Sequence, residues 1–342
     1  MQGGAWGEFN VIERSQWTDR EPGPGVPERM GGHVMPSGEM APLSTSLGAG
    51  DGVYVHQFAY PGASDSAVLV HEDAPALFRG LAALVKAAYE RAVAEKGTFT
   101  IALSGGSLLK ALGTLADVDG IDWTKWWVLW ADERVVPLDS ADSNYRGAKE
   151  AFLDRVPIPA DQVLTLDPTL APAQAAMMYE ARMRALGAEI LPKSPSDPTL
   201  PRVDLVLLGI GPDGHVASLF PNHPLTSATE GWVLAITDSP KPPPERITLS
   251  LPLINAASEV AIVAAGKSKA EVIQRLLEVQ SLPGALPAQL VRPADGKLTV
   301  FLDRESAADL RPDSWDVPSA HPRSDVPKPP KAKKKPAKKK AP

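Results

Sequence analysis

Cysteine is absent from the 342-residue sequence. This absence excludes disulfides, a thiolate nucleophile and a cysteine-based zinc site. The sequence also has no apolar run near the roughly 20 residues that cross a bilayer, and its N-terminus has no basic stretch followed by an apolar one. Any catalysis must therefore use carboxylates, histidine, lysine, arginine or serine. We expect a soluble, unsecreted, cytoplasmic protein, and leave targeting to an organelle open.

Charge is unevenly distributed along the chain. The formal net charge is -6, although eight lysines and no acidic residue lie between Lys328 and the C-terminus. The rest of the chain is therefore more acidic than the total suggests. An acidic body argues against general nucleic-acid binding, whereas the tail has to be considered separately.

Composition divides the chain into three parts. Residues 1–65 are rich in glycine and proline, which predicts a disordered extension. Residues 66–312 carry helix and strand patterns and predict an α/β domain. Residues 313–342 are rich in proline and lysine and predict a disordered basic tail. Contact of this tail with a polyanion and simple solvation both remain open.

Apolar residues in the central part alternate between helical and strand spacing. Helices are predicted over residues 73–95, 108–115, 171–186 and 269–279, with Asp73 as an N-cap. Strands are predicted over residues 99–103, 126–131, 203–210, 232–237, 247–251, 260–265 and 298–302. The alternation predicts an α/β fold with an open, mostly parallel, doubly wound (Rossmann-like) sheet and helices on both faces.

A glycine-dense turn covers residues 209–215 at the end of one predicted strand. It presents Asp213 and His215 two residues apart, where an open α/β sheet has its ligand crevice. The glycines and a proline of this turn fix where the two side chains point. The same residues also suit a tight structural turn in which Asp213 caps the next helix. The segment alone therefore does not distinguish a ligand site from a structural turn.

Two other predicted strands end in residues suited to a ligand. Ser104, Gly105, Gly106 and Ser107 follow one strand and precede a helix, which is how backbone N–H groups, hydroxyls and a helix N-terminus hold a phosphate. A plain tight turn explains this loop about as well. Asp132 and Arg134 follow the next strand and form either a surface ion-pair cluster or part of a site at the same rim.

Two cations occupy comparable positions later in the chain. Arg246 follows three prolines at the entry to a strand, and a stiff approach prepares a guanidinium for bidentate contact with phosphate. Lys267 lies on the loop after another strand. Each alone is more often a solvated surface base. Together with the glycine-serine loop, they favour a phosphate site.

These blocks, in this order, resemble the 6-phosphogluconolactonases, a family related to the glucosamine-6-phosphate deaminases and isomerases. The resemblance runs from about residue 67 to 310. The matching blocks are residues 102–107, 131–137, 142–145, 207–215, 218–221, 238–248 and 266–267. The resemblance implies hydrolysis of 6-phosphoglucono-δ-lactone to 6-phosphogluconate, in the oxidative pentose phosphate pathway, without a cofactor. It also implies a small sugar-phosphate lactone as the partner.

The expected chemistry assigns a role to each candidate residue. His215 acts first as base and then as acid, and either Asp213 or Asp132 orients its imidazole. Arg134 stabilises developing charge or binds the sugar acid. The phosphate is held by the loop of Ser104, Gly105, Gly106 and Ser107 together with Arg246 and Lys267. No histidine or carboxylate cluster has metal-ligand spacing, so we expect no metal.

Two other functions are considered. In the deaminase pattern a glutamate follows the histidine by five residues, and here that position is Phe220. An aromatic ring cannot transfer a proton, which weighs against a deaminase. A non-catalytic sugar-phosphate sensor with a basic tail is the other alternative, although Asp132, Asp213 and His215 are all present.

Overall fold

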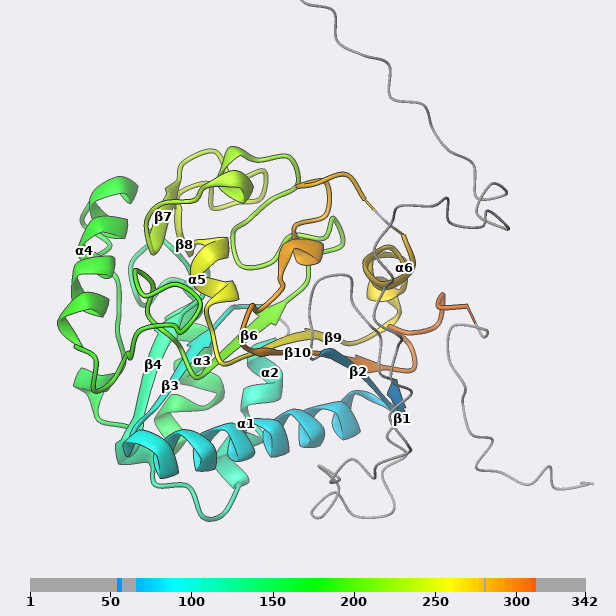
Figure 1. Cartoon of the computed structure of the whole chain (residues 1–342), viewed down its shortest axis with the longest axis horizontal. Helices are drawn as coiled ribbons and strands as arrows, with labels where there is room; N and C mark the ends of the chain where they lie inside the picture. The colour runs from blue at the N-terminus through cyan, green and yellow to red at the C-terminus, as the bar shows by residue number, and fades with distance from the viewer. Residues whose placement is uncertain (1–53, 57–65, 107, 280, 312–342) are drawn as a thin grey trace, which may run out of the picture. The chain divides into compact units, whose positions relative to one another are not determined.

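The computed structural model describes residues 54–56, 66–106, 108–279 and 281–311 (Figure 1). The predicted tail and nearly all of the predicted N-terminal extension lie outside these residues, so their disorder stays a prediction. Within the described part of the chain, no helix is long and apolar enough to span a bilayer.

A seven-stranded sheet forms the centre of the fold. Its strands, in spatial order, are β1 (Tyr54–His56), β2 (Ser66–His71), β10 (Lys297–Asp303), β9 (Glu259–Ala264), β6 (Leu205–Gly209), β3 (Phe99–Leu103) and β4 (Trp126–Trp130). Every neighbouring pair is parallel except β1 with β2. The expected open, mostly parallel α/β sheet is thus confirmed. Every residue of β3 and β9 is buried, as expected of parallel strands covered on both faces.

Helices cover both faces of this sheet. The helices are α1 (Ala74–Lys96), α2 (Leu108–Leu112), α3 (Asn144–Ala151), α4 (Pro172–Ala185), α5 (Leu251–Asn255) and α6 (Ala270–Glu278). Figure 1 shows α1 and α2 on one side and α6 on the other. Asp73 is the N-cap of α1, since its Oδ1 accepts a hydrogen bond from the Ala76 N–H at 2.8 Å, as predicted.

Three further strands form a separate antiparallel sheet, in the order β5 (Asp132–Arg134), β8 (Arg246–Leu249) and β7 (Val233–Ile236). The sequence predicted β7 and β8 as strands, and the mostly parallel sheet does not include them. Because β7 and β8 follow each other without an intervening helix, they pair antiparallel to each other instead. Helix α4 packs against them.

The direction of the chain reverses between β3 and β6. After β3 the chain moves outward to β4, whereas after β6 it moves the other way, to β9 and β10. In open α/β sheets ligands bind at such a reversal, outside the carboxyl ends of the strands. The two loops are joined there, because the Ser104 N–H donates to Leu207 O (3.1 Å) and the Gly209 N–H donates to Ser104 Oγ (2.8 Å).

Candidate active site

A pocket of about 190 Å³ lies at this reversal. It is lined by Ser104, Gly105, Gly106, Asp132, Arg134, Gly209, Ile210, Gly211, Pro212, His215, Ala217, Arg246 and Lys269. The structure therefore brings together most of the residues nominated from the sequence. Lys267 is exposed and is not among the lining residues, Asp213 does not line the pocket itself, and Ser107 lies outside the described residues.

The loop after β3 requires a glycine where it passes α3. A Cβ atom at position 105 would lie 1.9 Å from Asn144 Oδ1, so no larger residue fits without a shift. Gly106 has a φ of +76°, in the left-handed region that glycine adopts without strain. The Asn144 side chain also donates from Nδ2 to Asp132 O at 2.8 Å. This loop is thereby packed against the start of both β5 and α3.

The turn after β6 is closed by its own backbone. The Gly211 N–H donates to His215 O (2.9 Å), and the Gly214 N–H donates to Gly211 O (2.9 Å). A Cβ atom at position 211 would lie 2.0 Å from His215 Nδ1. The imidazole therefore lies directly over Gly211, which explains the need for glycine there.

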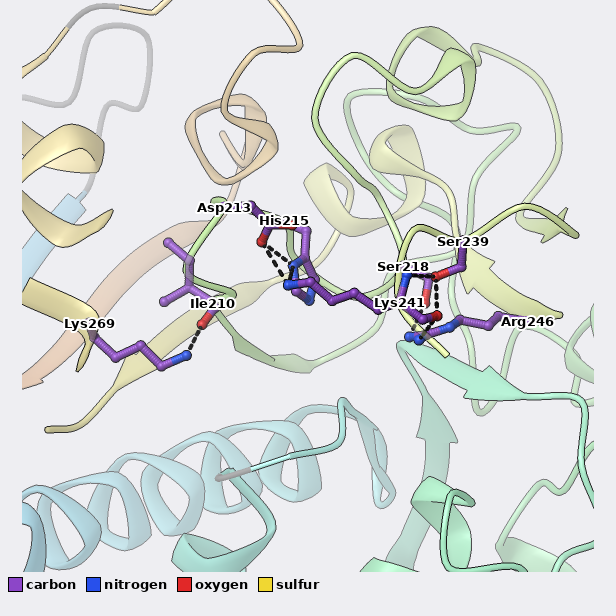
Figure 2. Close-up of polar contacts among 8 residues, drawn as sticks. All are labelled: Ile210, Asp213, His215, Ser218, Ser239, Lys241, Arg246 and Lys269. Carbon is purple, nitrogen blue, oxygen red and sulfur yellow. Dashed lines mark hydrogen bonds and ion pairs between the residues drawn. The ribbon is translucent and has the colours of Figure 1, made fainter. Parts of the chain in front are cut away.

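His215 and Asp213 form a hydrogen-bonded pair at the wall of the pocket (Figure 2). His215 Nδ1 lies 2.5 Å from Asp213 Oδ1. Lys241 Nζ lies 3.0 Å from the same Asp213 oxygen and 3.1 Å from His215 Nδ1. Of the two carboxylates considered for the imidazole, Asp213 is the one in direct contact with it.

The surroundings shift the pKa of both members of the pair. Burial lowers the pKa of His215, Asp213 opposes this shift, and Lys241 adds to it. Burial alone would raise the pKa of Asp213, but hydrogen bonds and charge from His215 and Lys241 outweigh burial and lower the pKa to about 2. The pair at neutral pH is therefore a neutral imidazole beside an ionised carboxylate.

Phe220 packs against the imidazole. Its ring centroid lies 4.8 Å from that of His215, and its side chain is buried. The guanidinium carbon of Arg246 lies 5.6 Å from the centroid of the same ring. Where a deaminase pattern has a carboxylate, this chain therefore has a buried aromatic ring in contact with the imidazole.

Asp132 is buried in β5 and its carboxylate is hydrogen bonded within the protein. Its Oδ2 accepts from the Ser218 hydroxyl at 2.8 Å, and its Oδ1 lies 3.4 Å from Asn144 Nδ2. Asp132 is only 3% exposed but lines the pocket. It joins the β6 turn, the small sheet and α3.

Two arginines line the pocket and differ in how many hydrogen bonds they make within the protein. The Arg246 guanidinium is 2% exposed and donates to three backbone carbonyls and to Ser218 Oγ. Arg134 donates from Nη1 to Asp142 O at 3.0 Å. Its Nε is buried and has no hydrogen-bond partner among the residues that the structure describes. Among the described residues, Arg134 is thus held by fewer hydrogen bonds than Arg246.

The cations around the pocket repel one another. Burial lowers the pKa of Arg246, and nearby Arg134 lowers it further. Burial likewise lowers the pKa of Lys269, with a further contribution from Lys241. Positive groups held this close favour occupation of the pocket by an anion.

Sequence reasoning missed several residues of the site. Lys269 lines the pocket and donates to Ile210 O at 2.7 Å, whereas the nominated lysine was Lys267. Both belong to one short 3₁₀ turn, Lys267–Lys269, and residues two apart on a helical turn point in different directions. Lys241 was also missed, although it lies within the block 238–248 that carries the resemblance.

Comparisons with known proteins agree with this geometry. The family model described as "Glucosamine-6-phosphate isomerases/6-phosphogluconolactonase" matches residues 72–300. A rice protein (Oryza sativa subsp. indica) named "Probable 6-phosphogluconolactonase 3, chloroplastic" is 46% identical over 223 residues, which is 64% of this chain and 68% of that protein. An Arabidopsis thaliana protein named "Probable 6-phosphogluconolactonase 1" is 41% identical over 249 residues, 71% of this chain and 93% of the relative.

Solved structures show the same similarity. The structure of 6-phosphogluconolactonase from Trypanosoma brucei matches with a TM-score of 0.61 and 28% identity, over 73% of this chain and 100% of that one. The Thermotoga maritima enzyme matches with a TM-score of 0.60 and 28% identity, over 70% and 99%. These named relatives are hydrolases, and the chain belongs to the glucosamine-6-phosphate isomerase/6-phosphogluconolactonase family.

Proposed function

We propose that this protein hydrolyses 6-phosphoglucono-δ-lactone to 6-phosphogluconate, in the oxidative pentose phosphate pathway. The observation that carries the proposal is the contact of His215 Nδ1 with Asp213 Oδ1, at 2.5 Å, on the wall of a pocket rich in cations. A proton-transfer group and an anion site in one pocket are what hydrolysis of a phosphorylated lactone needs. The names of the family members support the same substrate.

In the proposed mechanism His215 is the proton-transfer group. Its Nδ1–H donates to Asp213, which leaves the Nε2 lone pair to take a proton from water as that water attacks the lactone carbonyl carbon. Arg134 stabilises the negative charge that forms on the carbonyl oxygen. The tetrahedral intermediate then loses its bond to the ring oxygen. The imidazolium gives its proton to that oxygen as it leaves, which returns His215 to the neutral form.

The substrate phosphate is assigned to the loop after β3 and to two cations that line the pocket. Ser104, Gly105 and Gly106 supply a polar loop at a strand end, and Arg246 adds a buried positive charge. We propose Lys269 as the lysine that faces the phosphate, because it lines the pocket and Lys267 does not. We propose no metal or organic cofactor for this reaction.

The activity is tested by adding purified protein to freshly prepared 6-phosphoglucono-δ-lactone and following the loss of the lactone above its spontaneous hydrolysis. His215→Asn should keep the fold, measured by circular dichroism, and reduce turnover by about 10²- to 10⁴-fold, the usual contribution of a positioned acid-base group. Asparagine keeps polarity at this position but cannot exchange a proton near neutral pH.

His223→Asn is a matched control. His223 also contacts a carboxylate, with 3.1 Å between its Nε2 and Asp238 Oδ1, but it does not line the pocket. Turnover of this variant should stay within about twofold of wild type, because His223 is not among the residues that line the pocket. A folded His215→Asn variant with near wild-type turnover would remove His215 from the mechanism. Absence of lactone hydrolysis in the wild type would remove the function.

A deaminase or isomerase activity is the second candidate within the family. The packing of Phe220 against His215 argues against it, because no proton-transfer group occupies that position. Incubation with glucosamine 6-phosphate should release no ammonia. A turnover comparable to that on the lactone would reverse this assignment.

Location and the basic tail are proposed separately. We propose a cytoplasmic enzyme, and imaging of the tagged full chain distinguishes this location from the plastid in the name of the rice relative. For the tail we propose contact with a polyanion. Residues 328–342 contain only lysine, proline and alanine. Their removal should abolish salt-sensitive binding to a polyanion such as heparin and leave turnover unchanged.

A further inference from the structure

The segment between β7 and β8, residues 239–245, is held by the arginine that follows it. Arg246 Nε donates to Pro243 O (2.8 Å), and Nη2 donates to both Lys241 O (2.8 Å) and Pro242 O (3.1 Å). One guanidinium therefore engages three consecutive carbonyls. Ser239 closes the other end, because its hydroxyl donates to Lys241 O at 2.8 Å. We call residues 239–245 the strap.

The buried end of Arg246 ties the strap to the rest of the site. Its Nη1 lies 3.4 Å from Ser218 Oγ, and that hydroxyl donates to Asp132. Most of the guanidinium N–H groups are thus used within the protein. Figure 2 shows the guanidinium directed at the backbone carbonyl of Lys241 and at Ser218. These contacts fix the strap and leave little of the guanidinium free for a ligand.

The strap delivers one side chain to the reacting pair. Lys241 Nζ lies 3.0 Å from Asp213 Oδ1 and 3.1 Å from His215 Nδ1. Its three protons can be donated to Asp213 but not to a protonated Nδ1. Lys241 is therefore compatible with the tautomer that donates from Nδ1 to Asp213, and its positive charge opposes a second proton on the ring.

We propose that Lys241 is a positioning residue of the Asp213–His215 pair, delivered to that pair by the strap that Arg246 holds. The proposal rests on the role given to His215 in the proposed function. Lys241 contacts the same carboxylate oxygen as the imidazole and keeps the imidazole in its neutral, proton-accepting form. Lys241, between two strands of the small sheet, thus influences the protonation of His215, which follows a strand of the large sheet.

Four charged groups face the imidazole or its partner. Asp213 and Asp132 favour the protonated ring, whereas Lys241 disfavours it. Lys269 lies near enough to Asp213 and Lys241 to interact with both. Removing Lys241 removes a charge that counteracts the two carboxylates, so the His215 ring should then take a proton at a higher pH.

The test is a titration of His215 by NMR, followed through its ring carbon-bound proton in wild type and in Lys241→Met. The chain has six histidines, and the signal that disappears in His215→Asn identifies the right one. The midpoint in Lys241→Met should rise by about 0.5 to 1 pH unit, a modest value because the lysine side chain is 36% exposed and screened by water. The pH midpoint of the acid limb of kcat/KM for the phosphorylated lactone should rise by the same amount.

Lys241→Arg keeps the charge and should restore a midpoint within about 0.3 pH units of wild type. Lys86→Met, on α1, removes a half-buried lysine whose Nζ lies 4.0 Å from Glu90 Oε1, and should leave the midpoint unchanged. The NMR midpoint does not depend on turnover. A protein that fails to hydrolyse the lactone but shows the shift would refute the proposed function and leave the placement of Lys241 intact.

Two results would overturn the proposal. One is an unchanged midpoint in Lys241→Met with a raised KM for the phosphorylated lactone alone, which would make Lys241 a substrate ligand. The other concerns Arg246→Lys, which keeps a charge but loses the fork that holds three carbonyls. This variant should shift the midpoint in the same direction as Lys241→Met, and the double variant should shift it no further. Additive shifts in the double variant would mean that Arg246 does not act by positioning Lys241.

Discussion

The two sheets of this protein are stabilised in different ways. The seven-stranded sheet buries continuous apolar strands, as in β3 and β9, whose every residue is buried. The three-stranded sheet instead buries polar and charged side chains, namely Asp132, Glu133, Arg246 and Thr248. The large sheet places the glycine loops of the pocket. The small sheet holds charges that stay buried because they hydrogen bond to backbone groups and to neutral polar side chains.

Glu133 shows how the small sheet manages a buried charge. It is 1% exposed, and burial raises its pKa, although hydrogen bonds from the backbone N–H groups of Tyr145, Asn144 and Arg134 oppose that rise. Those N–H groups lie 2.7 to 2.8 Å from its oxygens, and the Ser143 hydroxyl lies 3.1 Å away. The carboxylate therefore satisfies the first turn of α3, whose open N–H groups have no partner within the helix.

The largest effect is expected for Glu133→Ala. This change removes the acceptor of four buried or part-buried donors and should lower the free energy of unfolding by about 3 to 5 kcal/mol. Chemical denaturation measures the loss. Glu150→Ala is the control on the same helix, because Glu150 pairs with Arg146 at the surface and should change stability by less than about 0.5 kcal/mol. Equal losses in the two variants would contradict the role of Glu133.

The large sheet could be predicted from the sequence far better than the small one. Residues 99–103 are predicted and observed as a strand, since a short apolar run followed by Ser104 and Gly105 leaves little choice. In contrast, β5 consists of Asp132, Glu133 and Arg134, and charged residues carry no strand pattern. They form a strand only because β8 pairs with them, and β8 is distant in sequence.

The same limit applies to the site. The turn with Asp213 and His215 is predictable because the pair and its glycines are contiguous in sequence. The contact of Lys241 with that turn depends on Arg246 engaging three carbonyls, which no local pattern shows. Likewise, the choice between Lys267 and Lys269 depends on how one short turn is oriented.

The second prediction tests which lysine serves the proposed phosphate site. Lys269→Met should reduce kcat/KM for the phosphorylated lactone by about 10- to 150-fold, equal to a loss of about 1.5 to 3 kcal/mol for a charge-assisted contact. Unphosphorylated gluconolactone should be much less affected. Lys267→Met, two residues away and exposed, should change neither rate by more than about threefold. The reverse ranking would restore the assignment made from sequence.

The third prediction compares one buried methyl group in the large sheet with one buried hydroxyl in the small sheet. Thr248 Oγ1 accepts from the Ser218 N–H at 3.3 Å, so Thr248→Val should cost about 1 to 3 kcal/mol by leaving a buried donor without a partner. Ile262→Val in β9 removes only a methylene and should cost about 0.5 to 1.5 kcal/mol. Denaturation of both variants measures the difference. A larger loss in Ile262→Val would mean that apolar packing dominates in both sheets.

The smallest effect is expected in the pH dependence of the unfolding free energy. This dependence separates the effect of burial on the pKa of His215 from the effect of Lys241. Because the pKa of His215 is lowered in the folded protein, first by burial, the unfolded chain binds this proton more readily as pH falls below 6.5. The group therefore reduces stability as pH falls from 6.5 towards the lowered pKa. Between pH 7.5 and 5.5 the unfolding free energy of wild type should fall more steeply than that of His215→Asn. The slope for Lys241→Met should lie between the two, because this variant loses only the effect of the lysine on the imidazole.

Denaturation series over this range measure the slopes. Asp213 contributes little there because its pKa is lowered to about 2 from 3.8. Parallel slopes for wild type and His215→Asn would mean that burial does not disfavour the imidazolium, and the neutral base on which the mechanism depends would need another cause.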